Sequence, residues 1–474
     1  MSSPIESSVT RRSFVGGLVA CGAGSFMPML FAEKSRPLLR FGVVSDVHIG
    51  GRKESSERLA FALQWLKARD VDAVLFPGDI AHLGQIWQME AFADIWYRVF
   101  PKTGPKVELM ISTGNHDAWE MGLAAQSEAE RRKNWLFYAD NAQRTWRRLF
   151  DEDFKPVWRK AVKGYMFMGS QWQTFNPDLE GYMAAHRVEF DREKPFFHCQ
   201  HEHPKGTCHG LYGGENGDNG QAARAFVGFP NAVVFSGHSH CSLADERAVW
   251  QGAFTSIGAG CLHEGGYSFT YDNGTAFWHP SFKTHIMKPL NDPDNWGGDP
   301  AGGCFEMVDV YSDHLVVARR SSVVDLPIGP DWIVPIPAGR SRALDFDVRR
   351  AEGIAPVFGA GARLQATLCP EGSDLAMTAY RRVPCIRVTI PPTDLSRGSR
   401  VFSYGLRVLC EGREVKAGQV FAAGFAGPRE HAACSTEWIV LCKDLPARCP
   451  LVVTATPSDC FGRAGLPLST EMVI

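Results

Sequence analysis

The chain has little of several features that assign a protein to a class at first sight. Its 50 Lys and Arg residues nearly balance 52 Asp and Glu residues, and the formal net charge is −2. Such a balance gives no reason to expect nucleic acid or an anionic membrane surface as a partner. The sequence also contains no internal repeat and no low-complexity tract.

Closely spaced cysteine pairs are absent as well. No two of the 13 cysteines form a Cys-x-x-Cys pair, which argues against a zinc ribbon or a thioredoxin-like motif. Twelve cysteines follow Cys21, and seven of them lie between Cys369 and Cys460. Disulfides and small buried thiols both fit this distribution, and no pairing follows from the sequence.

The first 32 residues read as an export signal. The segment TRRSFV at 10–15 precedes a mildly apolar, Gly- and Ala-rich run that extends to Ala32. An Arg pair before such a run resembles a bacterial twin-arginine signal, which implies a periplasmic or extracellular protein. The run is shorter than the ~20 apolar residues that span a bilayer, so we expect no stable membrane span in the mature protein. Cys21 also ends a lipoprotein-like box, which leaves lipid anchoring as the less favoured alternative.

The length of 474 residues and a hydrophobic share of 45% predict a sizeable core and more than one domain. Short apolar runs alternate with segments of helical periodicity, which indicates an α/β fold with parallel strands. The predicted strands are 39–44, 74–76, 107–111, 195–197 and 233–235, and the predicted helices are 56–69, 85–100 and 128–150. Residues 307–319 predict a closing strand pair.

The last part of the chain has a different texture. Four prolines between 327 and 339 indicate a connector, and we place a linker at 326–351. Short β-type runs follow, with a hairpin expected at 411–413, so residues 352–474 are predicted to form a small all-β sandwich domain. The closing stretch 452–462 resembles fibronectin type III or other immunoglobulin-like modules.

Five short polar blocks follow predicted strands. In chain order they are Asp46-Val47-His48, Gly78-Asp79, Gly114-Asn115-His116-Asp117, the His-rich stretch 197–204, and Gly237-His238-Ser239-His240. Residues i and i+2 of an extended segment point the same way, so paired ligands can converge on one cation. Ligands in α/β sheets bind at the carboxyl ends of strands, where these blocks are expected.

The ordered set of blocks resembles the calcineurin-like metallophosphoesterases over residues 38–320. That resemblance implies an αββα-type sandwich of two sheets flanked by helices, expected at 38–325, with a bridging carboxylate between two divalent metal ions. On this chain the first ion would be held by Asp46, His48 and His240, and Asp79 would bridge. The second would be held by Asn115, His201 and His238, although His198 and His203 remain alternatives to His201.

The resemblance also implies a mechanism. A hydroxide bridging the two metals would attack the phosphorus of a phosphomonoester or phosphodiester. His116 would protonate the leaving group, and Asp117 would orient His116 or fix its tautomer. Arg52, next to Lys53, and Asn115 are the predicted substrate-binding residues. The leaving group would be read by loops, with Trp119 and His263 among the residues to consider.

One position departs from a known branch of the family. Purple acid phosphatases place a Tyr ligand three residues after the Gly-Asp block, and here that residue is His82. This argues against a Tyr-ligated ferric ion and leaves Mn, Fe or Zn, since mixed oxygen and nitrogen ligands do not select one metal. The alternative functions are a non-catalytic metal- or glycan-binding exported protein and, with less support, a nucleotidase.

Overall fold

The computed structural model describes residues 36–119, 126–172, 178–190, 193–210, 217–263, 269–272, 275–278, 303–370, 383–425 and 427–474. Contacts group Pro37–Ile474 into one compact unit. The predicted signal at 1–32, including Cys21, lies outside the described residues. Among those residues, no helix combines the length and apolar character that crossing a bilayer requires.

The first of two six-stranded sheets contains both parallel and antiparallel strands. Its strands, in spatial order, are β14 (Trp332–Pro335), β13 (His314–Ser321), β12 (Cys304–Val310), β1 (Leu39–Val43), β2 (Ala73–Pro77) and β3 (Glu108–Ser112). β1, β2 and β3 are parallel, whereas β12 pairs with β1 in the antiparallel sense. The expected strand pair at 307–319 is present as β12 and β13.

The second sheet has the same mixed character. Its strands, in order, are β4 (Val157–Val162), β5 (Tyr165–Ser170), β6 (Phe196–Cys199), β7 (Ala232–Ser236), β9 (Thr255–Gly258) and β8 (Val249–Gln251). The four strands β5, β6, β7 and β9 run parallel, and β4 and β8 are antiparallel edges. A separate hairpin joins β10 (Phe269–Asp272) and β11 (Thr275–Trp278).

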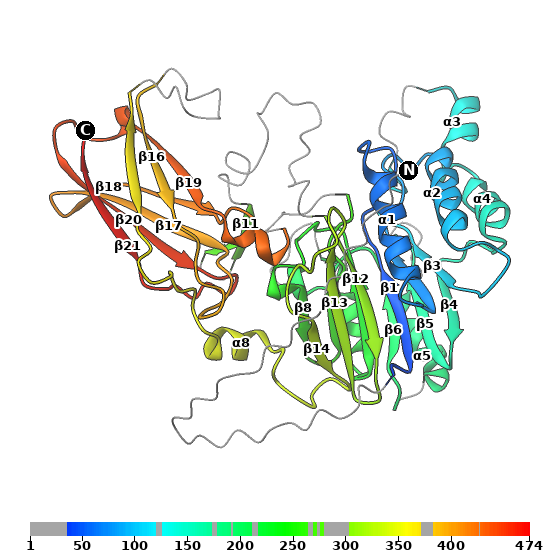
Figure 1. Cartoon of the computed structure of the whole chain (residues 1–474). Helices are drawn as coiled ribbons and strands as arrows, with labels where there is room; N and C mark the ends of the chain where they lie inside the picture. The colour runs from blue at the N-terminus through cyan, green and yellow to red at the C-terminus, as the bar shows by residue number, and fades with distance from the viewer. Residues whose placement is uncertain are drawn as a thin grey trace, which may run out of the picture. The chain divides into compact units, whose positions relative to one another are not determined.

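Helices cover the outer faces of the two sheets (Figure 1). The helices packed with the first sheet are α1 (Ser55–Lys67), α2 (Ile86–Val99) and α4 (Asn141–Phe150), and α3 (Glu128–Asn134) precedes α4. The second sheet carries α5 (Leu179–Ala185) and α6 (Gln221–Phe226). The predicted αββα-type sandwich is therefore confirmed.

Aromatic side chains fill the space between the sheets. Phe41 of β1 is fully buried, and its ring centroid lies 5.2 Å from Phe167, 4.8 Å from Phe197 and 5.7 Å from Phe235. These three partners come from β5, β6 and β7 of the opposite sheet. Of the strands in this contact, β1, β6 and β7 carry polar blocks at their carboxyl ends, so the contact fixes the spacing between the two halves of the site.

The helix expected at 128–150 was wrong in detail. The single helix predicted at 128–150 is two helices, because Trp135 is extended and Ala139 is left-handed, with φ 53°. The Asn141 side chain donates to the carbonyls of Arg132 and Trp135 and so satisfies the end of α3. The segment 326–351 also has regular structure, because β14 extends the first sheet past residue 325 and α8 (Phe346–Glu352) follows.

The C-terminal residues form two antiparallel sheets. One contains β15 (Gln365–Cys369), β16 (Cys385–Ile390) and β19 (Thr436–Leu441); the other contains β18 (Arg413–Phe421), β17 (Ser403–Cys410), β20 (Pro450–Ser458) and β21 (Leu468–Val473). The expected hairpin joins β17 and β18, and Glu411 and Gly412 in its two-residue loop both have positive φ, as a type I′ turn requires. Cys410 and Cys449 form a disulfide.

Phe41→Ala should lower the free energy of unfolding by about 3–5 kcal/mol, since it leaves a cavity among three aromatic rings. Leu38→Ala is the control, because Leu38 is 52% exposed just before the same strand. Urea unfolding of both variants measures the difference. Equal stability of the two variants would contradict the role assigned to the aromatic contact.

Candidate metal centre

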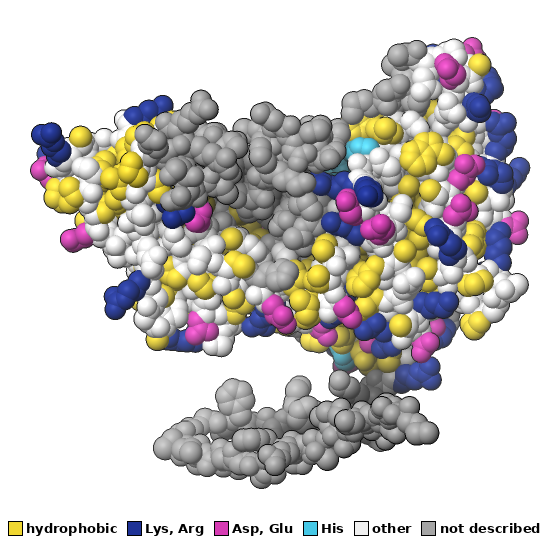
Figure 2. Space-filling view, turned by 45° about the horizontal axis from the view of Figure 1, so that its top comes forward, with side chains coloured by type: hydrophobic (Ala, Val, Ile, Leu, Met, Phe, Trp, Pro, Cys, Tyr) yellow, Lys and Arg dark blue, Asp and Glu magenta, His cyan; other side chains and the backbone are white. Residues whose placement is uncertain are grey.

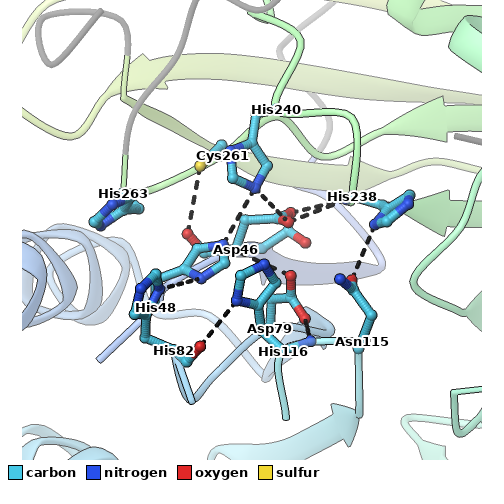
Figure 3. Close-up of polar contacts among 12 residues, drawn as sticks. Asp46, His48, Asp79, His82, Asn115, His116, His238, His240, Cys261 and His263 are labelled. Atoms are coloured by element: carbon cyan, nitrogen blue, oxygen red, sulfur yellow. Dashed lines mark hydrogen bonds and ion pairs between the residues drawn. The ribbon is translucent and has the colours of Figure 1, made fainter. Parts of the chain in front are cut away.

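Each of the five polar blocks follows a strand at its carboxyl end. Asp46 and His48 come after β1, Asp79 after β2, and the block 114–117 after β3. On the second sheet His201 follows β6, and the turn 237–240 follows β7. The strand ends of both sheets therefore meet at one site, which Figure 3 shows in close-up.

The backbone at this site is strained. Five residues have φ in the left-handed region, which residues other than glycine rarely adopt. They are Asp46 (53°), His48 (50°), Asp79 (53°), His238 (68°) and His240 (52°). Each such residue costs about 1–3 kcal/mol, and such residues persist where the surrounding structure enforces them, often at functional sites. Five of the seven predicted ligands share this conformation, which turns each side chain off its strand and into the site.

Three glycines make room for the ligands. A Cβ atom on Gly237 would collide with the carboxylate of Asp46, and one on Gly114 would collide with the carboxylate of Asp79. A Cβ atom on Gly78 would collide with the ring of His201, and Gly78 also has φ 96°. The glycines in the predicted blocks are therefore required by close approach.

The first group of acceptors contains Asp46, His48, Asp79 and His240. One ligand atom from each residue lies within 4.8 Å of the others. The Nε2 atoms of His48 and His240 are 3.2 Å apart, and His240 Nε2 is 3.2 Å from Asp46 Oδ1. His48 Nε2 lies 3.6 Å from Asp79 Oδ2.

The second group contains Asp79, Asn115, His201 and His238. His201 Nε2 lies 2.9 Å from Asn115 Oδ1, 3.1 Å from Asp79 Oδ2 and 3.2 Å from His238 Nδ1. His238 Nδ1 is 3.0 Å from Asn115 Oδ1. Asp79 thus belongs to both groups, which is the place that the resemblance implies for a bridging residue.

The chemistry of these atoms fits a cation. His201 Nδ1 lies 2.8 Å from the carbonyl oxygen of Pro77, which can only accept, so Nδ1 carries a hydrogen. The opposite nitrogen, Nε2, then points its lone pair at two oxygen acceptors, Asn115 Oδ1 and Asp79 Oδ2. Acceptors that face one another require a positive charge between them, either a proton or a metal ion.

The pKa values of His201 and Asp79 also favour a positive charge between these atoms. Burial opposes a charge on His201, but the Asp79 carboxylate outweighs it and raises the pKa of His201 to about 9. Burial also opposes the charge on Asp79, yet His201 and His116 hold the pKa of that carboxyl below its usual range. A divalent cation would take the place of the proton on His201, because both use the same lone pair.

His116 lies at the partly exposed side of the site, and its orientation differs from the expected one. Its Nδ1 donates to the carbonyl oxygen of His82 at 2.9 Å, and its backbone N–H donates to Asp79 Oδ1 at 2.8 Å. Its ring packs edge-on against Trp119, with centroids 4.2 Å apart.

Asp117 does not orient His116 as the sequence interpretation expected. Its carboxylate accepts backbone N–H groups from Ile80, Ala81 and Gly114, at 3.3, 2.7 and 2.8 Å. Burial and the charge of Asp79 raise the pKa of Asp117 to about 7. Asp117 therefore ties the block after β3 to the loop after β2.

The structure separates the three candidate histidines near β6. His201 lies in the second group, whereas His198 contacts Ser170 Oγ and Gln200 Oε1, at 3.4 and 3.2 Å, away from the acceptors. Burial lowers the pKa of His198 to about 3.

His203 supports the turn that carries two predicted ligands. Its ring nitrogens lie 2.8 Å from Ser236 Oγ and 2.8 Å from Ser239 Oγ, on either side of that turn. Cys261 approaches the first group, with Sγ 3.5 Å from the carbonyl oxygen of Asp46. The sequence reasoning missed both supporting contacts, since neither residue stands in a recognisable motif for that role.

Arg52 lies beside the first group. Its Nε donates to His263 Nε2 at 3.2 Å, and His263 Nδ1 is 2.8 Å from Ser55 Oγ. The His263 ring centroid is 5.1 Å from that of His48. Arg52 is therefore held close to the acceptors by a buried histidine.

Comparison with known families identifies the fold. Residues 39–242 match the family model described as calcineurin-like phosphoesterase. The chain carries a calcineurin-like phosphoesterase domain. The matched range contains both acceptor groups and His116, and it ends before residue 320, where the sequence resemblance was expected to end. No curated protein matches the chain.

The solved structures that this chain resembles are only distantly similar to it. A dimetal phosphatase from Danio rerio is 10% identical, with 63% of this chain and 99% of that chain covered and a TM-score of 0.37. A purple acid phosphatase from yellow lupin (Lupinus luteus) seeds is 14% identical, with 63% and 53% covered and a TM-score of 0.38. At these scores the structures add nothing to the assignment of the domain.

His201→Ala should lower the bound metal from two equivalents to one, because it removes a nitrogen from the second group alone. His198→Ala, the neighbouring buried histidine, should keep both. Metal per folded protein, measured by mass spectrometry after Mn²⁺ loading and gel filtration, tests this. Loss of metal from His198→Ala but not from His201→Ala would contradict the assignment.

Proposed function

We propose that this protein is a metal-dependent phosphoric ester hydrolase with a dinuclear centre that acts on a phosphomonoester or a phosphodiester. The observation that carries the proposal is the sharing of one carboxylate, that of Asp79, by two groups of converging acceptors. The calcineurin-like phosphoesterase domain supports the same reaction class. Oxygen and imidazole ligands are compatible with Mn, Fe or Zn.

The chain's own residues have separate tasks in this proposal. Two divalent cations, when bound, would lower the pKa of a shared water and neutralise charge on the phosphate. The buried residues Asp46, His48, Asp79 and His201 would hold the ions from below. Asn115, His238 and His240 are partly exposed, so the substrate would approach from their side.

His116 would deliver a proton to the leaving group. The His82 carbonyl can only accept, so Nδ1 of His116 keeps its hydrogen in both charge states. The proton that His116 gains or loses is therefore the one on Nε2. General acid catalysis of this kind contributes about 10²–10⁴-fold to a rate.

Arg52 and Asn115 would bind the substrate phosphate. Arg52 is tethered through His263 beside the first group, and Asn115 faces the second group with Oδ1. The face drawn in Figure 2 mixes Lys and Arg with Asp and Glu, in keeping with the net charge of −2. Attraction of the phosphate would therefore depend on the metal centre and nearby residues.

We further propose that the enzyme acts outside the cytoplasm. The segment at 10–15 supports twin-arginine export, and the Cys410–Cys449 disulfide fits an oxidising compartment. The two C-terminal sheets support a fibronectin-like module as a further part of the proposal.

His116→Ala should lower kcat by about 10²–10⁴-fold on an alkyl phosphate, because the alkoxide then leaves without a proton. The loss on p-nitrophenyl phosphate should be much smaller, since nitrophenolate is a stable anion. His186→Ala, at a partly exposed histidine after α5, is the control and should retain wild-type rates on both esters. Steady-state kinetics of Mn²⁺-loaded proteins with verified metal content gives the comparison.

Equal losses on the two esters would contradict the role of His116 as proton donor. A metal-loaded wild-type protein that hydrolyses no mono- or diester, with or without EDTA, would favour the non-catalytic binding alternative.

Replacing Arg11 and Arg12 by Lys should retain the full-length protein in the cytoplasm, since the twin-arginine pathway reads that pair. Fractionation of a bacterial host, followed by immunodetection, measures this. Unchanged export of the double variant would contradict the proposed route.

A further inference from the structure

His82 occupies a position between the proposed first metal group and the proposed proton donor. It is only 8% exposed, and its backbone N–H donates to the Ile49 carbonyl at 3.2 Å. Its carbonyl accepts from His116 Nδ1, and its ring Nδ1 lies 3.3 Å from Nδ1 of His48. The backbone carbonyl would accept from His116 with any residue at position 82, whereas the contact with His48 requires the side chain of His82.

The orientation of His48 determines what this ring contact does. His48 Nε2 faces His240 Nε2 and Asp79 Oδ2, so Nε2 is the nitrogen that would bind a cation. A neutral imidazole that binds metal through one nitrogen carries its hydrogen on the other, and that N–H almost always donates to an acceptor. For Nδ1 of His48, the polar partner within the described part of the chain is Nδ1 of His82.

We infer that His82 is a positioning residue that accepts the Nδ1 hydrogen of His48 and thereby fixes the tautomer and the ring direction of this proposed metal ligand. The inference rests on the proposed metal-dependent function. His82 must then be neutral, with its hydrogen on Nε2. The ring of His82 then orients His48, the proposed ligand of the first ion. Its carbonyl orients His116, the proposed proton donor.

The surroundings of His82 hold the ring in this orientation. Its ring stacks between those of His116 and His263, with centroids 5.3 and 6.2 Å away and an interplanar angle of 28° in both cases. His263 is itself hydrogen-bonded to Ser55 Oγ and Arg52 Nε. A Cβ atom on Gly51 would lie 2.8 Å from His82 Nδ1, so the ring also depends on a glycine at that position.

A matched pair of variants isolates the acceptor. His82→Asn places an amide oxygen near the position of Nδ1, and His82→Leu has the same shape as Asn but cannot accept a hydrogen. Both are made in full-length His201→Ala protein, so that titrated Zn²⁺ reports on the first group alone. Affinity is measured by competition with a chromophoric chelator, and melting in EDTA checks the fold of each variant.

His82→Leu should bind Zn²⁺ about 10–100-fold more weakly than His82→Asn, which should remain close to the parent. If His82 had only a structural role, both variants would melt at lower temperatures in EDTA, and their Zn²⁺ affinities would not differ from each other. Equal affinities of His82→Leu and His82→Asn, whether both normal or both weak, would overturn the inference.

Gly51→Ala offers a second test that leaves His82 in place. The added methyl group should displace the ring and weaken Zn²⁺ binding in the same background, whereas Gly359→Ala, where a Cβ meets no atom within 4 Å, should not. Unchanged affinity of Gly51→Ala would count against the inference. Absence of Zn²⁺ binding by the wild-type protein would instead refute the proposed function, and the role of His82 with it.

Discussion

The carboxylate of Asp79 is the point at which the two halves of the site are joined. Its Oδ2 faces His48 from the first sheet and His201 from the second, and its Oδ1 accepts the backbone N–H of His116. These contacts bring several lone pairs and one negative charge into a buried space, which is unfavourable unless a positive charge occupies it. The folding of both sheets must therefore supply enough packing energy to hold acceptors together that would otherwise move apart.

The backbone shows how the fold achieves this. Strands end immediately before each block, and the residues that follow adopt left-handed conformations at Asp46, His48 and Asp79. The aromatic contact around Phe41 sets the distance between the sheets, and glycines admit the carboxylates where any side chain would collide. Rigid strands thus enforce a geometry that a flexible loop would relax, which is how strained residues persist at functional sites.

Much of this arrangement could be predicted from the sequence, because its signals are local. Apolar runs located β1, β2, β3, β6 and β7, and the order of the polar blocks predicted which residues would meet. The break between α3 and α4 could not be predicted, since the Leu136 N–H leaves the helical pattern and donates to the Gly84 carbonyl, a contact between segments far apart in the sequence. The roles of Asp117 and His82 were also hidden, because backbone N–H and carbonyl groups have no signature in a sequence. Among His198, His201 and His203, the resemblance favoured His201, and only tertiary contacts separated the three.

The central claim is that two cations share Asp79. Diffraction from crystals of the Mn²⁺-loaded protein, collected on the high-energy side of the manganese absorption edge, tests it directly. Two anomalous peaks about 3.5–4 Å apart, one on each side of the Asp79 carboxylate, are the expected result. A single peak, or two peaks of which neither contacts Asp79, would contradict the claim.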